Sequence, residues 1–295
     1  AYIHNLEPFW DHYWKNGEND KLGWRLEYNM KHRGDVYATH GLGPVAQALD
    51  IHRGDRMKTL VAMDTKSVVG KSLVEERTGQ PCENFRNGDH TTTLIRTENG
   101  KVIEIQHDVM TPQPYNRLYQ LTGTKGFANK YPIEGYALDA KQLNASGVAP
   151  EVDNLNSHSF MPKKDMEALV QKYQHPILKK YGEMAKEVGG HGGMDFIMDS
   201  RLVYCLQNGL PLDMDVYDLA EWCALAELGE ISMDNNCAAV EFPDFTRGEW
   251  NVVKGYKHAY ASPEEEQASM EKAKAFTAKL KRTGSQRVGE READK

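Results

Sequence analysis

The sequence predicts an α+β fold, an open and mostly antiparallel β-sheet with helices packed on one face. Two observations predict it: β-rich runs fill residues 90–131, and a helical apolar period begins after Pro162. The 295 residues are 40% hydrophobic and 27% charged, which is enough to build a packed core. We expect one α+β domain over residues 1–283 and a polar, disordered tail over residues 284–295.

The first forty residues are rich in aromatics, histidine and glycine but have no clean period, which indicates loop with short strands. Residues 44–51 predict a short helix, because proline is tolerated in a first helical turn. Residues 59–63 form a strand-like apolar run.

Asn99-Gly100 separates two β-rich runs, residues 90–96 and 101–109, and this dipeptide strongly favours a hairpin. Residues 117–123 and 127–131 follow as a second pair of strands, joined by a short turn. The whole block therefore predicts an antiparallel sheet.

The C-terminal half is expected to be helical. Residues 141–159 are polar and turn-rich and predict a surface loop, after which an amphipathic helix follows Pro162. Further helices are predicted over residues 194–207, from Asp215 as N-cap, and over residues 264–280.

Charge and composition exclude several classes of protein. A net charge of −7 argues against a general nucleic-acid binder. No apolar run approaches the ~20 residues of a membrane span, and the N-terminus is no signal peptide, so we expect a soluble chain without a membrane partner. The four cysteines show no metal-binding spacing and predict free core thiols; no metal site is expected.

One local motif resembles a nucleotide-binding fingerprint. Residues 41–46 satisfy the GxGxxA fingerprint, and Asp64 follows about twenty residues later. The run before it is too polar for a buried strand and the following sheet is antiparallel, so a glycine-rich loop that enters a helix is the favoured interpretation.

Tyr37 and His40 form the richer candidate site. In an extended segment they would face opposite sides, but a bend at the flanking glycines would let them converge on one pocket. A phenol and an imidazole can together move protons near neutral pH. The alternative is a hydrogen-bonded structural histidine beside a core tyrosine.

Other segments are weaker candidates. Tyr2 and His4 share one face of a short strand, and Trp24-Arg25 could stack and clamp hydroxyl groups. His191 lies among four glycines before a helix, where it could serve a site or only permit tight packing.

Several motifs together resemble one family. Residues 1–6 (AYIHNL), 37–44 (YATHGLGP), 116–119 (NRLY) and 190–195 (GHGGMD) are similar to the NAD-dependent α-N-acetylgalactosaminidases of glycoside hydrolase family 109, within the glucose–fructose oxidoreductase and inositol dehydrogenase superfamily. The resemblance runs from Ala1 to about Trp250. Members of that family are bacterial and often exported, which leaves the compartment of this protein open.

The resemblance implies a cofactor that this chain would not hold alone. Family members carry NAD in an N-terminal Rossmann domain, which is absent here, so we expect a fragment that is inactive by itself. The superfamily also implies a homo-oligomer formed through the open face of the sheet.

The resemblance also implies site residues. Tyr37 and His40 would be catalytic, and Tyr37 would also touch the nicotinamide of NAD. The positions implied to contact the sugar are Tyr2, Arg25, Tyr37, Ala38, Thr39, His40 and Tyr119.

The implied reaction is hydrolysis of terminal N-acetylgalactosamine, or another N-acetylhexosamine, through oxidation at carbon 3, elimination, addition of water and reduction. Two alternatives stay open. One is a sugar or cyclitol dehydrogenase of the same superfamily, and the other is a non-enzymatic carbohydrate-binding module.

Overall fold

The structure, a computed structural model, describes residues 1–4, 23–152, 154–255 and 258–268, with short pieces at 271–272, 274–275 and 278–279. The chain divides into two compact units, Ala1–Tyr173 with Val216–Tyr256 and Gln174–Asp215 with Lys257–Lys295. The tail predicted over residues 284–295 lies outside the described residues.

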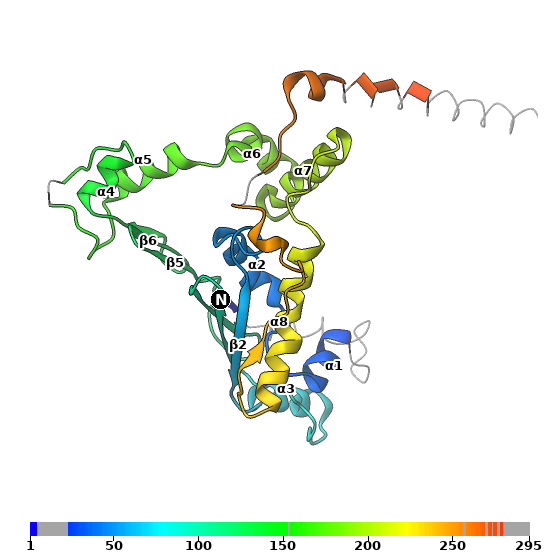
Figure 1. Ribbon diagram of the computed structural model, residues 1–295. Helices are drawn as coiled ribbons and strands as arrows, with labels where there is room; N and C mark the ends of the chain where they lie inside the picture. Colours follow the sequence, from blue (N-terminus) through cyan, green and yellow to red (C-terminus); the bar gives the residue numbers. More distant parts are fainter. Residues whose placement is uncertain are drawn as a thin grey trace, which may run out of the picture. The chain divides into compact units, whose positions relative to one another are not determined.

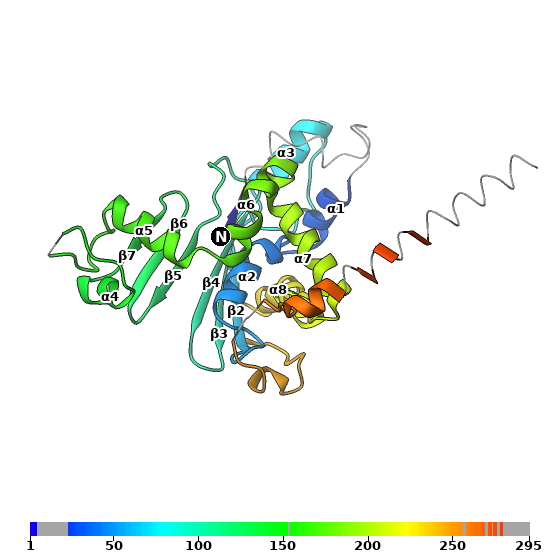
Figure 2. The same cartoon turned by 90° about the horizontal axis from the view of Figure 1, so that it is seen from above.

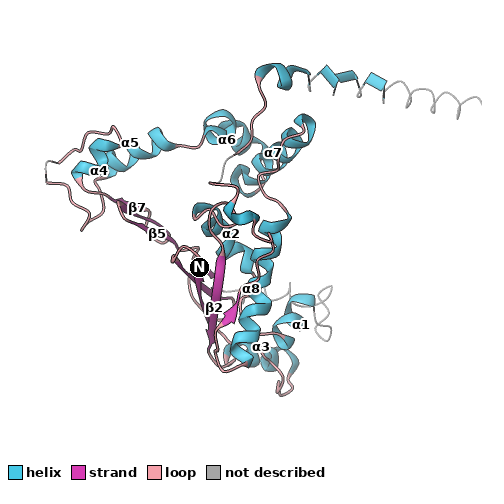
Figure 3. Cartoon of the chain, viewed as in Figure 1, coloured by secondary structure: helices cyan, strands magenta, loops and turns pink. Residues whose placement is uncertain are grey.

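The first unit is built on a five-stranded sheet in the order β1-β4-β3-β2-β8. Its strands are β1 Tyr2–Ile3, β2 Met57–Asp64, β3 Thr91–Thr97, β4 Val102–Asp108 and β8 Val240–Glu241. The strands are drawn in magenta in Figure 3. β1 runs parallel to β4, and the other pairs are antiparallel, with the predicted hairpin between β3 and β4. The α+β class with a mostly antiparallel sheet is therefore confirmed.

Helices α2 (Ala38–Ala48) and α8 (Val216–Asp234) cover one face of this sheet (Figures 1 and 2). The strand residues alternate, so Leu60, Ile95 and Ile105 are buried and pack in one cluster with Leu42 and Leu225 of the two helices. On the other face Met63, Leu94 and Val102 are exposed. The sequence alternation in these strands thus sets which face binds the helices.

A second, three-stranded sheet lies in the same unit, where the sequence predicted one continuous sheet. It consists of β5 Tyr119–Gly123, β6 Gly126–Lys130 and β7 Gly135–Ala137, all antiparallel. Helix α4 (Ala140–Ala145) replaces the start of the predicted 141–159 loop, because the Asp139 carboxylate caps it by accepting the Gln142 N–H. Helix α5 (Lys163–Tyr173) follows as predicted.

Helices α1 (Trp24–Lys31) and α3 (Val69–Thr78) were also missed by the sequence analysis. Helix α1 lies in the segment predicted to be loop. Helix α3 has no local capping residue; instead the distant Asp89 carboxylate accepts the N–H groups of Val69 and Gly70. A cap supplied by another part of the chain leaves no signal in the local sequence. The short 3₁₀ turn η4 (Glu249–Asn251) follows β8.

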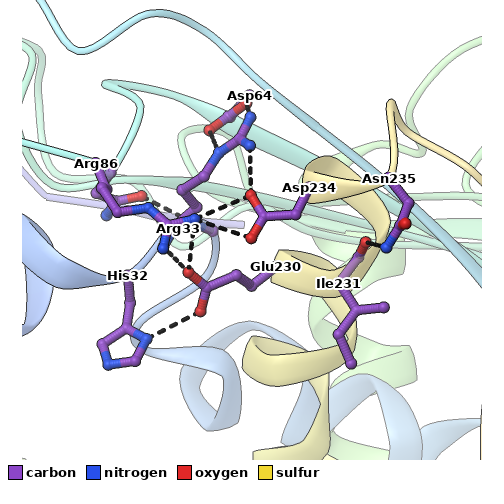
Figure 4. Close-up of polar contacts among 10 residues, drawn as sticks. His32, Arg33, Asp64, Arg86, Glu230, Ile231, Asp234 and Asn235 are labelled. Atoms are coloured by element: carbon purple, nitrogen blue, oxygen red, sulfur yellow. Dashed lines mark hydrogen bonds and ion pairs between the residues drawn. The ribbon is translucent and has the colours of Figure 1, made fainter.

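An ion-pair network fixes α1 against α8 (Figure 4). The Arg33 guanidinium, just after α1, donates to both oxygens of Asp64 at 2.7 and 3.0 Å and to Asp234 of α8 at 2.8 Å. His32 approaches Glu230 of α8 at 2.9 Å. Arg33 thus links the end of α1 to both β2 and α8, and its bidentate pair with Asp64 holds a defined geometry.

The second unit contains α6 (Pro176–Val188), the 3₁₀ turn η3 (His191–Gly193) and α7 (Met194–Asn208). The α7 bounds and the start of α8 agree with the predicted helices. Of the helix predicted over residues 264–280, residues 264–268 are helical and much of the rest lies outside the described residues. Within the ranges the structure describes, no helix is long and apolar enough to cross a bilayer.

The cysteines are free, as predicted, but not all of them are in the core. Cys82 and Cys205 are buried, whereas Cys237 is half-buried and Cys223 is exposed. Cys223 lies on the face of α8 that lines the cavity described next.

Candidate functional site

A cavity of about 310 Å³ opens in the first unit between α1, the start of α2 and α8. Its walls come from three segments: α1, the turn that leads into α2, and α8. The lining residues are Trp24, Arg25, Tyr28, Asn29, Asp35, Val36, Tyr37, Ala38, Thr39, His40, Cys223 and Ala226. Two of these walls, α1 and α8, are linked by the contacts of His32 and Arg33 with Glu230 and Asp234.

Tyr37 and His40 converge on this cavity because the backbone is helical there. The extended segment expected at this point was wrong: Tyr37 is the N-cap and His40 lies in the first turn of α2. Residues three apart share a helix face, and the two ring centroids are 5.7 Å apart, edge to face. Helix geometry, not a bend at the glycines, brings the phenol to the imidazole.

The glycine motif lies inside α2, so the expected glycine-rich loop was also wrong. A Cβ at Gly41 would lie 3.1 Å from Ile105 of β4, and one at Gly43 would lie 3.2 Å from the Trp222 ring of α8. These glycines let α2 fit between the sheet and α8.

Tyr2 and Arg25 complete the cluster around Tyr37. The buried Tyr2 ring packs 5.2 Å from the Tyr37 ring and 4.7 Å from the His40 ring. The Nε–H of Arg25 donates to the Tyr37 hydroxyl at 3.1 Å. The Thr39 hydroxyl is 3.5 Å from Nδ1 of His40.

Tyr119 contacts the backbone of α2 at a carbonyl that Pro44 leaves without a helical donor. Proline has no N–H, so the carbonyl of His40, four residues earlier, has no helical donor. The Tyr119 hydroxyl donates to this carbonyl instead. Tyr119 is not among the residues that line the cavity; it lines a separate hollow with β4 and β5 residues. Here Tyr119 supports the backbone of His40.

Burial and one cation set the charge state of His40. Burial, and after it the Arg117 guanidinium, lower the pKa of His40 below its ordinary value. The imidazole is therefore neutral near pH 7 and can accept a proton. Arg117 also lies over the Tyr2 ring, with its Cζ 5.2 Å from the ring centroid. Burial raises the pKa of Tyr2 to about 12, so that phenol stays protonated.

Neither of the two weaker histidine candidates, His4 and His191, lines the cavity. His4 packs edge to face on Tyr115 at 5.1 Å and is 6.0 Å from the Tyr2 ring. His191 belongs to the second unit, is exposed, and pairs with the Asp195 carboxylate at 2.9 Å.

Three residues at the site were missed by the sequence analysis: Asp35, His107 and Arg117. Asp35 and His107 are buried beneath Tyr37. His107 could have been found, since it alternates with Ile103 and Ile105 and so must face the core. The placement of Asp35 and Arg117 depends on tertiary packing.

Comparison with known proteins identifies a family. The family model "Glycosyl hydrolase 109, C-terminal domain" matches residues 8–252. "Glycosyl hydrolase family 109 protein 4" of Phocaeicola vulgatus is 86% identical over 295 residues, which are all of this chain and 57% of that protein. The family 109 protein of Porphyromonas gingivalis is 61% identical over 261 residues, or 88% of this chain and 54% of that protein.

A solved structure, "Levoglucosan dehydrogenase, complex with NADH and L-sorbose", superposes with a TM-score of 0.49 at 14% identity, covering 83% of this chain and 58% of that chain. So low a score supports no conclusion about function. The chain spans little more than half the length of the relatives that it matches. Because the family model covers most of its residues, the chain belongs to glycosyl hydrolase family 109, whose C-terminal domain it contains.

Proposed function

We propose that this chain is the substrate domain of an NAD-dependent glycosidase that releases terminal N-acetylgalactosamine, or a related N-acetylhexosamine. The reaction would proceed by oxidation, elimination, addition of water and reduction. One observation carries the proposal: in a family 109 domain, Tyr37, His40 and Arg25 line a single cavity, with the phenol next to a neutral imidazole.

The acids at the cavity support this route over direct displacement. Displacement at a sugar carbon uses two carboxyl groups on either side of the glycosidic bond, about 5–10 Å apart. Among the described residues that line the cavity, Asp35 is the one carboxylic acid. Burial raises its pKa to about 7, and its partner for displacement is missing from this wall.

The residues present fit NAD at the edge of this cavity. Tyr37 presents a partly exposed aromatic ring, on which a flat nicotinamide could pack beside the sugar. When bound, NAD supplies a hydride acceptor and donor for carbon 3 of the sugar.

The side chains of this domain would move protons and orient the sugar. As a neutral imidazole, His40 would accept the proton of the 3-hydroxyl group. The Tyr37 side chain, acting as a phenolate beside the Arg25 guanidinium, would accept the proton from carbon 2 and return it when water adds, and the same geometry allows these two roles to be exchanged. Arg25 holds the Tyr37 oxygen with one N–H and has further donors for sugar hydroxyls.

Of the remaining positions implied to bind the sugar, two would contact it directly and two would support the residues that do. Ala38 and Thr39 line the cavity and would contact the sugar directly. Tyr2 would support the two rings from behind, and Tyr119 would act through the backbone of His40.

The test is hydrolysis of an aryl α-N-acetylgalactosaminide by the whole protein that contains this sequence. Tyr37→Phe and His40→Ala should each lower kcat/KM by about 10²–10⁴-fold, the usual contribution of a general acid or base. Tyr173→Phe, on the exposed end of α5, is the matched control and should be unaffected.

Two results would contradict the proposal. Net accumulation of NADH on addition of free sugar would indicate a dehydrogenase. Sugar binding without turnover, unchanged in both variants, would indicate a binding module.

A further inference from the structure

Two buried polar side chains lie directly beneath the turn that carries Tyr37. Asp35 precedes α2 and His107 is on β4, and each is only 2% exposed. One carboxylate oxygen of Asp35, Oδ1, accepts the Tyr37 N–H at 3.1 Å. The other oxygen, Oδ2, has no hydrogen-bond partner, and neither has Nε2 of His107. Nε2 and Oδ1 are 3.9 Å apart.

Such a pair is unusual, because buried polar groups in folded proteins are nearly always hydrogen-bonded. A single proton between the two side chains would give Nε2 of His107 a hydrogen-bond partner. A protonated carboxyl group is a donor, a neutral imidazole nitrogen is an acceptor, and a shift of under 1 Å would bring Oδ1 and Nε2 within hydrogen-bond distance. The proton would also cancel the charge that burial penalises most.

The electrostatic surroundings agree with a shared proton. Burial raises the pKa of Asp35 to about 7, although the Tyr37 N–H opposes this. Burial also lowers the pKa of His107 to about 3, so the imidazole is uncharged. The titratable or charged groups that surround the pair are Tyr2, Tyr37, His40, His90, Asp108 and Arg117.

We propose that Asp35 and His107 form a buried pair that shares one proton and positions Tyr37, and that loss of this proton to solvent weakens the site. Asp35 acts through the N–H of Tyr37 and is therefore a positioning residue. A carboxylate left beneath Tyr37 would disfavour the phenolate form that accepts the carbon-2 proton. The functional half of this inference rests on the proposed role of Tyr37.

Asparagine at position 35 is the sharpest variant. Its side-chain oxygen can still accept the Tyr37 N–H and the side chain cannot ionise, so it keeps the neutral charge of the protonated acid. Leucine has a similar size and cannot accept this hydrogen bond.

The first measurement is the infrared carbonyl band of a protonated carboxyl group, taken as the difference between the wild-type whole protein and Asp35→Asn. We expect the band in the wild type, and we expect it to disappear as the pH rises through about 7. If Asp35→Asn does not fold, NMR of ¹³C-labelled aspartate in the wild type follows the same titration. A carboxyl group that is ionised at every pH would overturn the pair.

The second measurement is the pH profile of hydrolysis. The wild type should lose kcat at alkaline pH with the apparent pKa of the pair, Asp35→Asn should lose this decline while remaining active, and Asp35→Leu should lose kcat at all pH values. An alkaline decline that is unchanged in Asp35→Asn would overturn the positioning role. The infrared band needs no substrate, so its absence counts against the pair, whereas a band without hydrolysis counts against the proposed function and the positioning role together.

Discussion

His40 is held in place at the residue scale by two contacts that act on different atoms. Arg117 acts on the charge of its imidazole, and Tyr119 acts on its backbone carbonyl. The two effects can be separated by substitution, because one should change the pH dependence and the other the rate.

Removing the Arg117 charge should move the acidic limb of activity. Burial and Arg117 both disfavour the imidazolium, so the pKa of His40 lies below its ordinary value and the neutral base persists to lower pH. In Arg117→Gln one of these causes is gone, and the acidic limb of kcat/KM should shift to higher pH. The measurement is a pH–rate profile of the whole protein.

Arg247→Gln is the control for that experiment, since it removes the same charge from an exposed turn after β8. It should leave the acidic limb in place. An acidic limb that does not move in Arg117→Gln would show that His40 is not the base seen in the profile.

Removing the Tyr119 hydroxyl should lower kcat more than it changes KM. In Tyr119→Phe the His40 carbonyl loses its donor, because Pro44 cannot provide one, and an unsatisfied partly buried group costs about 1–3 kcal/mol. Steady-state kinetics and thermal unfolding check this together. A raised KM with unchanged kcat would instead assign Tyr119 to direct sugar binding.

At the scale of elements, α2 packs at close range against α8. Gly43 faces the Trp222 ring of α8, where a Cβ would lie 3.2 Å from two ring atoms. An alanine gains up to about 1 kcal/mol of helix propensity, but crowding in a packed interface costs about 1–3 kcal/mol. Because the ring belongs to the buried core cluster, we expect crowding to dominate.

Gly43→Ala should therefore destabilise the fold by about 1–2 kcal/mol. Gly182→Ala is the matched control: this glycine also lies inside a helix, α6, but nothing lies within 4 Å of the added Cβ. It should stabilise by up to about 1 kcal/mol. Denaturant unfolding measures both. Equal effects would mean that the glycines of α2 are not needed for packing.

The elements also show where the sequence was sufficient. Strong local signals predicted the β3–β4 hairpin, α7 and the start of α8, since Asn99-Gly100, Asn208-Gly209 and Asp215 mark their ends. Helix α3 could not be predicted this way because its cap comes from Asp89, and α2 was predicted too short because Pro44 suggested a start rather than an interior position.

The candidate site likewise contains residues that the sequence could predict and residues that only the tertiary packing reveals. Family motifs marked Tyr37, His40 and Arg25, which the structure places on one cavity. The roles of these residues stay predictions. The support beneath them, Asp35 and His107, is brought together only by the packing of α2 on β4 and was not foreseen.

At the scale of the whole molecule, the open face of the sheet is the feature without a cover in the described residues. Met63, Leu94 and Val102, on three neighbouring strands, are 62%, 47% and 67% exposed there. A homo-oligomer formed through this face stays our prediction. Leu94→Lys should shift the sedimentation of the whole protein to a smaller species.

Val170→Lys provides the control for that change, because it places the same charge on an exposed apolar position of α5. It should sediment as the wild type does. A wild type that is already monomeric would contradict the prediction.

The central claim is that the sugar is oxidised, loses its carbon-2 proton and regains it, and the most direct test is hydrolysis by the whole protein in D₂O. The account predicts that the released N-acetylhexosamine carries solvent deuterium at carbon 2, read by NMR or mass spectrometry, because the proton moved through Tyr37 or His40 exchanges with the medium. A product formed at full rate with only its original hydrogen at carbon 2 would contradict it.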